Sequence, residues 1–211
     1  RMERKGDPMA SGKVDVGGWL SEAWGLYKAN FGLICVAGLL TGLLGFFTLG
    51  VLAGPLWAGL TLVILRASRK DQPAPLIGDV FKGFDVFLQA LLLFVALVVA
   101  GLIVGRIPMV GRLASTLLYP LVMFAICLVA DRKMEFWPAI VASYEKAKGE
   151  YVSLLILTLL AGLISAVGLL LFFVGVILTG PFATIVTVVA YRHLFEGAEA
   201  EAIPVEAPAA G

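Results

Sequence analysis

Apolar residues fill four long stretches of the chain that contain no charged side chain. These stretches are residues 31–65, 86–105, 113–130 and 151–191. A helix on the surface of a soluble protein needs a polar face toward water, so it does not stay apolar over such lengths. A helix that crosses a bilayer needs about 20 predominantly apolar residues. The pattern therefore predicts an all-α polytopic membrane protein.

Two of these stretches are too long for a single crossing. As one helix, residues 31–65 would extend about 52 Å, against a hydrocarbon core of about 30 Å. The segment GFFTLG at 45–50 is the predicted turn, and the second long stretch should turn near 169–175. The prediction is a bundle of six transmembrane helices, at about 31–46, 49–66, 86–105, 113–130, 152–171 and 174–192. The membrane domain takes residues 16–195, after a polar segment at 1–15 and before an Ala/Glu/Pro-rich tail at 196–211.

The charged residues predict the orientation of this bundle. With six spans, 14 of the 16 Lys and Arg residues fall on the side of the N-terminus, and only Arg106 and Arg112 fall on the other. Loops on the cytoplasmic side carry an excess of Lys and Arg. Both termini are therefore predicted to be cytoplasmic. No cleavable signal peptide is visible in the polar first 18 residues, so the first apolar run should act as a signal-anchor.

Parts of the chain repeat. The segment FFTLGVLAGP at 46–55 resembles FFVGVILTGP at 172–181, and Pro55 and Pro181 each lie 11 residues before an arginine. Pro120 lies 12 residues before Arg132 in a weaker third copy. Residues 19–66 and 139–192 should therefore superpose as hairpins of the same orientation. Pro55, Pro120 and Pro181 are predicted helix kinks near half the membrane depth, because proline breaks the helical hydrogen-bond ladder. Packing kinks are favoured over a hinge or a polar vestibule.

A short amphipathic segment precedes each predicted hairpin. Trp and Tyr favour the membrane–water interface, where one end of the ring is apolar and the other is wet. These segments should be interfacial helices, and their predicted anchors are Trp19, Trp24, Tyr27, Trp137 and Tyr144.

Three short motifs carry a resemblance to a known group. These are FKGF at 81–84 before a span, Pro120 with Asp131-Arg132 after it, and Gly180-Pro181 with Tyr191-Arg192 near the end. With them, residues 15–196 resemble a broad group of bacterial six-span membrane proteins, mostly uncharacterised. That group is similar to the membrane domain of some glycerophosphoryl diester phosphodiesterases. The resemblance implies the fold and no particular activity, since the soluble phosphodiesterase domain has no counterpart here.

The sequence offers little chemistry. No Asp, Glu, Lys, Arg or His falls inside a predicted span, although such residues usually mark ion or proton pathways. His193 is the only histidine, and we interpret it as an interfacial residue; Gln89 should reach toward the interface from the start of its span. We therefore expect no enzyme, no catalytic residue, no cofactor and no metal. A net charge of +1 without a basic stripe predicts no nucleic-acid partner.

Glycines are the other abundant feature, with 24 in the chain. Small residues four apart let helix backbones approach closely, within the bundle or against another protein. The candidates for helix packing or partner contact are Gly38, Gly42, Gly50, Gly54, Gly101 and Gly105.

These features favour a non-enzymatic scaffold or accessory subunit of a larger membrane complex, whose partners are membrane lipids and other membrane proteins. The alternative is a transporter or lipid-handling protein for an apolar or amphiphilic substrate. A continuous cavity at mid-membrane depth would favour this alternative. An intramembrane enzyme is disfavoured because catalytic groups are missing.

Overall fold

The computed structural model describes residues 15–106, 110–170 and 172–197, and these are helical nearly throughout, with no strand among them. The elements are α1 (Val16–Ala29), α2 (Phe31–Phe47), α3 (Ala53–Arg69), η1 (Ile77–Val86), α4 (Phe87–Gly105), α5 (Val110–Val122), α6 (Ala125–Arg132), α7 (Phe136–Lys148), α8 (Tyr151–Leu170), α9 (Phe172–Tyr191) and η2 (Arg192–Glu196). The predicted N-terminal segment and C-terminal tail lie outside this description, apart from Asp15, Glu196 and Gly197. The predicted turn near 169–175 lies among residues whose side chains are also outside it.

The helices form a pattern that occurs first at α1–α3 and again at α7–α9. A short helix is followed by a sharp bend, 89° between α1 and α2 and 105° between α7 and α8, and a long helix then leads into a returning one. Asp15 begins the first unit by accepting a hydrogen bond from the backbone N–H of Gly18 at 2.9 Å. In the middle unit, the 3₁₀ helix η1 leads directly into α4, and α5 and α6 return. A helical lead-in thus precedes each long helix, while superposition of the units stays a prediction.

Six membrane spans are not confirmed. Within the described residues, two helical stretches, Ile77–Gly105 and Leu113–Arg132, are long and apolar enough to cross a membrane. The number rises to four if the bent pairs α1–α2 and α7–α8 each count as one span. The difference has a simple cause at the first hairpin, where α2 and α3 have 17 residues each. Such helices extend about 26 Å, slightly less than the hydrocarbon core. The chain is an all-helical membrane protein.

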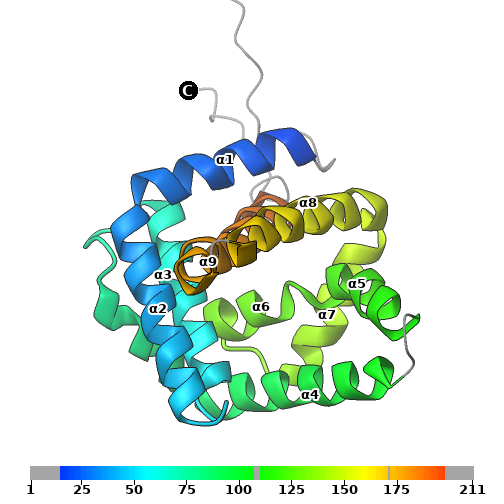
Figure 1. Cartoon of the computed structure of the whole chain (residues 1–211). Coiled ribbons are helices and arrows are strands. Elements are labelled where there is room, and N and C mark those ends of the chain that lie inside the picture. Colours follow the sequence, from blue (N-terminus) through cyan, green and yellow to red (C-terminus); the bar gives the residue numbers. More distant parts are fainter. Residues whose placement is uncertain (1–14, 107–109, 171, 198–211) are drawn as a thin grey trace, which may run out of the picture.

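The returning helices form the core. In Figure 1, α6 and α9 lie in the middle of the molecule, with α3 behind α2 on one side and α1, α4 and α5 around them. Every residue from 123 to 130 is buried, and so is every residue from 185 to 191. By contrast, α4 buries only Ala90 and Leu93. The outer helix α4 therefore leaves many large apolar side chains exposed, as expected for a surface that meets lipid tails.

The three prolines have different surroundings. Pro55 lies in the first turn of α3, where the missing N–H would have had no intrahelical partner, so it marks a helix start and not the predicted mid-helix kink. Pro120 lies inside α5, which ends two residues later, and α6 begins after a short break. Pro181 lies inside α9, which continues past it to Tyr191.

The break after Pro120 is supported from another helix. The buried hydroxyl of Ser143 on α7 accepts a hydrogen bond from the backbone N–H of Phe124 at 3.2 Å. The same hydroxyl donates to the carbonyl oxygen of Leu121 at 2.8 Å. Backbone groups freed in an apolar interior need such partners.

Several glycines allow close approach between helices. A Cβ on Gly38 would overlap the ring of Pro181, and one on Gly54 would lie 2.5 Å from the carbonyl oxygen of Ala90. The tightest contact was not predicted: a Cβ on Gly59 would overlap the carbonyl oxygen of Val80 where η1 crosses α3. The predicted Gly50 has a different role, because its φ of 85° helps the chain turn between α2 and α3.

Candidate functional site

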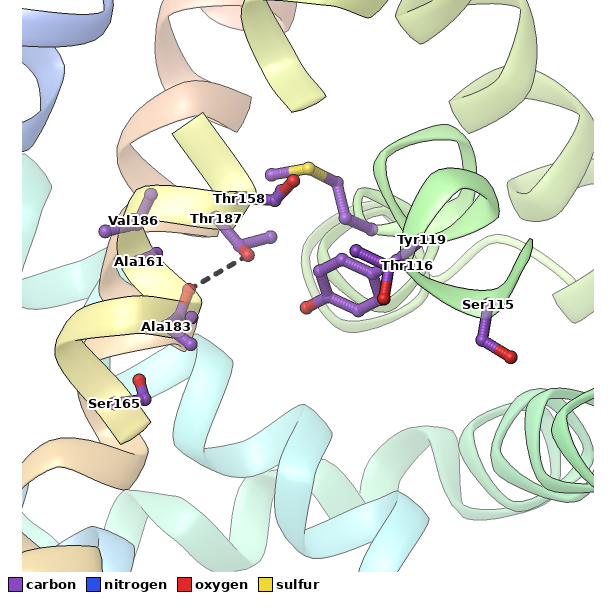
Figure 2. A pocket seen from close by; sticks show the side chains of 11 residues that line it. Ser115, Thr116, Tyr119, Thr158, Ala161, Ser165, Ala183, Val186 and Thr187 are labelled. Atoms are coloured by element: carbon purple, nitrogen blue, oxygen red, sulfur yellow. Dashed lines mark hydrogen bonds between the residues drawn. The ribbon is translucent and has the colours of Figure 1, made fainter. Parts of the chain in front are cut away.

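A cavity lined by hydroxyl groups lies between α5, α8 and α9. Its volume is about 390 Å³. Its polar lining comes from Ser115, Thr116 and Tyr119 of α5, Thr158 and Ser165 of α8 and Thr187 of α9. In Figure 2, the ring of Tyr119 points toward Thr187, whereas the hydroxyl of Ser115 points away from it. Its remaining lining is Met123, Ala161, Gly162, Ala183 and Val186. Among the described residues, the lining contains no charged side chain.

Three of these hydroxyl groups already donate their hydrogen to the backbone. Thr158 donates to the carbonyl oxygen of Leu155 at 3.0 Å, and Thr187 donates to that of Ala183 at 3.0 Å. Ser165 donates to the carbonyl oxygen of Thr179 at 3.4 Å and so joins α8 to α9. A hydroxyl has one donor and two acceptor lone pairs, so these groups still offer acceptors.

An apolar groove adjoins this cavity along α5. Its volume is about 620 Å³, and it lies between α4, α5 and α7. The two cavities share Ser115, Tyr119 and Met123 in their linings. The groove itself is lined almost wholly by apolar side chains, among them Trp57 and Phe94, and by Gly101. The two cavities thus adjoin α5, one lined by hydroxyl groups and the other mostly apolar. Hereafter we call the pair the joined cavity.

A cluster of charged residues ties the ends of several helices together near the site. Arg69 at the end of α3 donates from both terminal nitrogens to the two carboxylate oxygens of Asp131, at 2.8 Å each. Glu196 of η2 also accepts from Arg69, and the hydroxyl of Tyr191 donates to Asp131 at 3.0 Å. Hydrogen bonds to Asp131, the largest cause, raise the pKa of Arg69 above its usual value. The cluster fastens α3, α6 and α9 to one another.

His193 joins α1 to this cluster. Its ring stacks on Trp19 with centroids 5.1 Å apart, and Nε2 lies 2.7 Å from a carboxylate oxygen of Glu22. Arg192 lies 3.6 Å from the same carboxylate. The hydrogen bond with His193, followed by the opposing effect of burial, leaves the pKa of Glu22 below its usual value. His193 thus holds the first helix against the last one.

The predicted interface anchors divide into two groups. Trp24, Trp137 and Tyr144 expose their rings and stay candidates for contact with lipid headgroups. Trp19 and Tyr27 are buried against the protein, where Trp19 contacts His193 and Tyr27 contacts Phe182, so the prediction for these two is corrected. The amphipathic pattern located the helix, but it did not show which of its rings would be buried against α9 and η2.

The predicted packing glycines also divide. Gly38 and Gly54 lie at internal helix contacts, whereas a Cβ on Gly42, Gly101 or Gly105 would meet nothing within 4 Å. The latter three are exposed, and Gly101 lines the apolar groove. Contact of any of them with a partner protein stays a prediction.

Sequence reasoning missed the cavity, although it noted scattered Ser and Thr in the spans. A signal was present: Ser115 and Tyr119 are four residues apart, as are Ala183 and Thr187, so each pair lies on one helix face. Gln89 was interpreted as reaching the interface, and instead its amide oxygen accepts from the N–H of Phe136 at 3.0 Å. Among the described residues, no group of His, Cys, Asp or Glu is arranged to hold a metal ion.

The chain matches no protein-family profile, no curated protein and no solved structure. The resemblance to six-span membrane domains therefore stays a prediction.

Proposed function

We propose that this membrane protein handles lipids, binding an amphiphilic molecule in the joined cavity. The observation that carries the proposal is that a hydroxyl-lined cavity and an apolar groove adjoin α5 and share Ser115, Tyr119 and Met123 in their linings. Volumes of about 390 and 620 Å³ are within the usual range for ligand sites. An amphiphile would place its polar group among the hydroxyls and its chain in the groove. This reverses the preference drawn from sequence, which favoured a scaffold and named a continuous cavity at mid-membrane depth as the feature that would favour the alternative.

The proposed setting is a bacterial inner membrane, with six helices crossing or entering it and both termini in the cytoplasm. The charged cluster supports this arrangement, because Arg69, Asp131, Arg192 and Glu22 come from distant parts of the sequence and gather at one place. The clustering agrees with the excess of Lys and Arg expected on the cytoplasmic side. We also propose membership of the six-span group that the sequence resembles, and no enzymatic activity.

The test compares two glycine variants with matched chemistry. Gly101→Leu places a bulky side chain in the apolar groove, whereas Gly42→Leu places the same side chain on the outside of α2, away from the cavity. Both glycines have open space where the new side chain begins, so neither change should disrupt folding. Each protein is purified in mild detergent and analysed by native mass spectrometry.

We expect the unaltered protein and Gly42→Leu to retain lipid in stoichiometric amount, and Gly101→Leu to lose it. Equal retention by the two variants, or absence of bound lipid from all three proteins, would contradict the proposal.

A scaffold or accessory subunit is the second candidate, and one observation favours it. The turn after α2 exposes large apolar side chains, with Phe46 77% and Leu49 94% exposed, beside the exposed Gly42. A partner helix could cover this surface. If it does, Gly42→Leu should release a larger complex while Gly101→Leu leaves that complex intact.

A further inference from the structure

We infer that the polar group of the bound molecule is uncharged and carries a free hydroxyl, as in a lipid alcohol. This inference rests on the proposed function and specifies the chemistry of the ligand. It comes from the kinds of groups that line the cavity between α5, α8 and α9 and from the hydrogen bonds that these groups already make.

The absence of charge from the lining selects an uncharged ligand. Among the described residues, neither part of the joined cavity is lined by Asp, Glu, Lys, Arg or His. An ionised group placed in an apolar site without an opposite charge loses far more hydration energy than hydroxyls restore. Asp131 and Arg192, which follow the cavity on α6 and η2, already make ion pairs or hydrogen bonds with other residues. Among the described lining residues, a phosphate group would therefore find no counter-charge.

The existing hydrogen bonds select a ligand that can donate. Thr158, Ser165 and Thr187 each use their only hydrogen on a backbone carbonyl. What they present to the cavity is acceptor lone pairs, and a ligand that only accepts could not satisfy them. A hydroxyl on the ligand could donate to one of these oxygens.

The other side of the cavity complements that hydroxyl. Figure 2 shows the phenol of Tyr119 directed across the cavity toward Thr187. A phenol hydroxyl both donates and accepts, so Tyr119 could donate to the oxygen of the ligand while a threonine accepts the hydrogen of the ligand. Since Tyr119 and Ser115 also line the apolar groove, the attached chain would leave the hydroxyl directly into apolar surroundings.

Three probes with the same acyl chains separate these requirements. Dioleoylglycerol has a free hydroxyl and no charge; its 3-O-methyl ether lacks the donor; and dioleoylphosphatidylglycerol keeps hydroxyl groups but adds a phosphate charge. Each is titrated against the full chain in mild detergent, and binding is measured by native mass spectrometry. Geranylgeraniol, an isoprenoid alcohol, then distinguishes the two sources of a lipid hydroxyl.

We expect dioleoylglycerol or geranylgeraniol to bind at least about tenfold more tightly than the methyl ether and the phosphatidylglycerol, which corresponds to about 1.4 kcal/mol. Thr187→Val removes an acceptor without changing shape and should weaken binding of the favoured alcohol about three- to tenfold. Thr61→Val is the matched control, because Thr61 donates to the carbonyl four residues earlier in α3 in the same way but does not line the joined cavity.

Equal binding of the methyl ether would overturn the requirement for a donor, and equal or tighter binding of phosphatidylglycerol would overturn the requirement for an uncharged group. Equal loss with Thr61→Val and Thr187→Val would overturn the assignment to this cavity. If a lipid binds and Gly101→Leu releases it, but the alcohols are not preferred, the proposed function survives and this inference fails. If no probe binds and no lipid is retained on purification, both fail.

Discussion

The buried hydroxyl of Ser143 should be among the most important polar groups for stability. It holds the two backbone groups at the break between α5 and α6, the carbonyl of Leu121 at 2.8 Å and the N–H of Phe124 at 3.2 Å. Phe124 and Ser143 are fully buried, so water cannot reach the N–H of Phe124 without opening the core, whereas Leu121 is partly exposed. Ser143→Ala removes the hydroxyl and leaves both backbone groups unsatisfied.

The expected loss of stability follows from the number of backbone groups that lose their partner. An unsatisfied buried donor or acceptor costs about 1–3 kcal/mol. Two such groups, with some relaxation of the break, give a loss of about 2–4 kcal/mol in the free energy of unfolding. An average side-chain hydrogen bond between membrane helices contributes about 0.6 kcal/mol, so the two magnitudes are well separated.

Titration with a denaturing detergent, followed by circular dichroism, measures the free energy of unfolding. Ser68→Ala is the control, because the Ser68 hydroxyl donates only to the carbonyl of Leu65 in its own helix, and we expect a change of about 0.5 kcal/mol or less. Ser143→Cys, which keeps a weak donor and acceptor, should lie between the two. If Ser143→Ala and Ser68→Ala were equally stable, the break would not depend on α7, and the argument would be refuted.

Three further predictions concern packing and charge. Gly59→Ala should lower the free energy of unfolding by about 1–3 kcal/mol, because its Cβ would overlap the carbonyl of Val80. Gly42→Ala is the control and should be neutral or stabilising by up to about 1 kcal/mol. Equal effects of the two changes in detergent unfolding would contradict this prediction. Asp131→Asn should lower the free energy of unfolding by about 1–3 kcal/mol. The loss is smaller than for a fully buried ion pair, because the Asp131 side chain is 16% and the Arg69 side chain 29% exposed. As the control, Asp85→Asn changes an exposed residue and should alter the free energy of unfolding by less than about 0.5 kcal/mol in the same assay. The pKa of Glu22 is lower in the folded protein than usual, so its contribution is present near neutral pH and is lost as pH falls below about 4. The stability advantage over Glu22→Gln should therefore shrink in acid, and an advantage unchanged at pH 3 would count against it.

Local sequence patterns predicted the elements of the fold well where local physics decides them. The turn predicted at 45–50 agrees with an α2 that ends at Phe47 and an αL residue at Gly50, because glycine and the limit on helix length act within a few residues. The amphipathic lead-in helices are present before the first and third hairpins for the same reason. The number of spans was harder to predict, because α2 and α3 are close to the minimum crossing length and hydropathy does not fix where each helix begins.

Contacts between distant segments were not predictable, and these contacts build the candidate site. The break between α5 and α6 leaves the carbonyl of Leu121 and the N–H of Phe124 in need of partners. Pro120 does not predict which residue supplies them, because Ser143 lies 23 residues further on, in a segment with the pattern of an ordinary interfacial helix. Gly59 has no glycine four residues away in α3, so the spacing of small residues does not identify it. It nevertheless has the tightest contact described, because the backbone of η1 leaves no room for a Cβ at this position.

The cavity depends on the same kind of relation. Its hydroxyl groups come from α5, α8 and α9. None of them indicates a binding site by itself, because Ser and Thr in an apolar helix usually form hydrogen bonds with the backbone of their own helix. That local bond is what gives the site its selectivity: by consuming the hydrogens of Thr158 and Thr187, it turns two neutral hydroxyls into acceptors. From the sequence alone, these residues are interpreted as packing residues. Only the fold, which places them opposite Tyr119, indicates that a lipid hydroxyl could bind there.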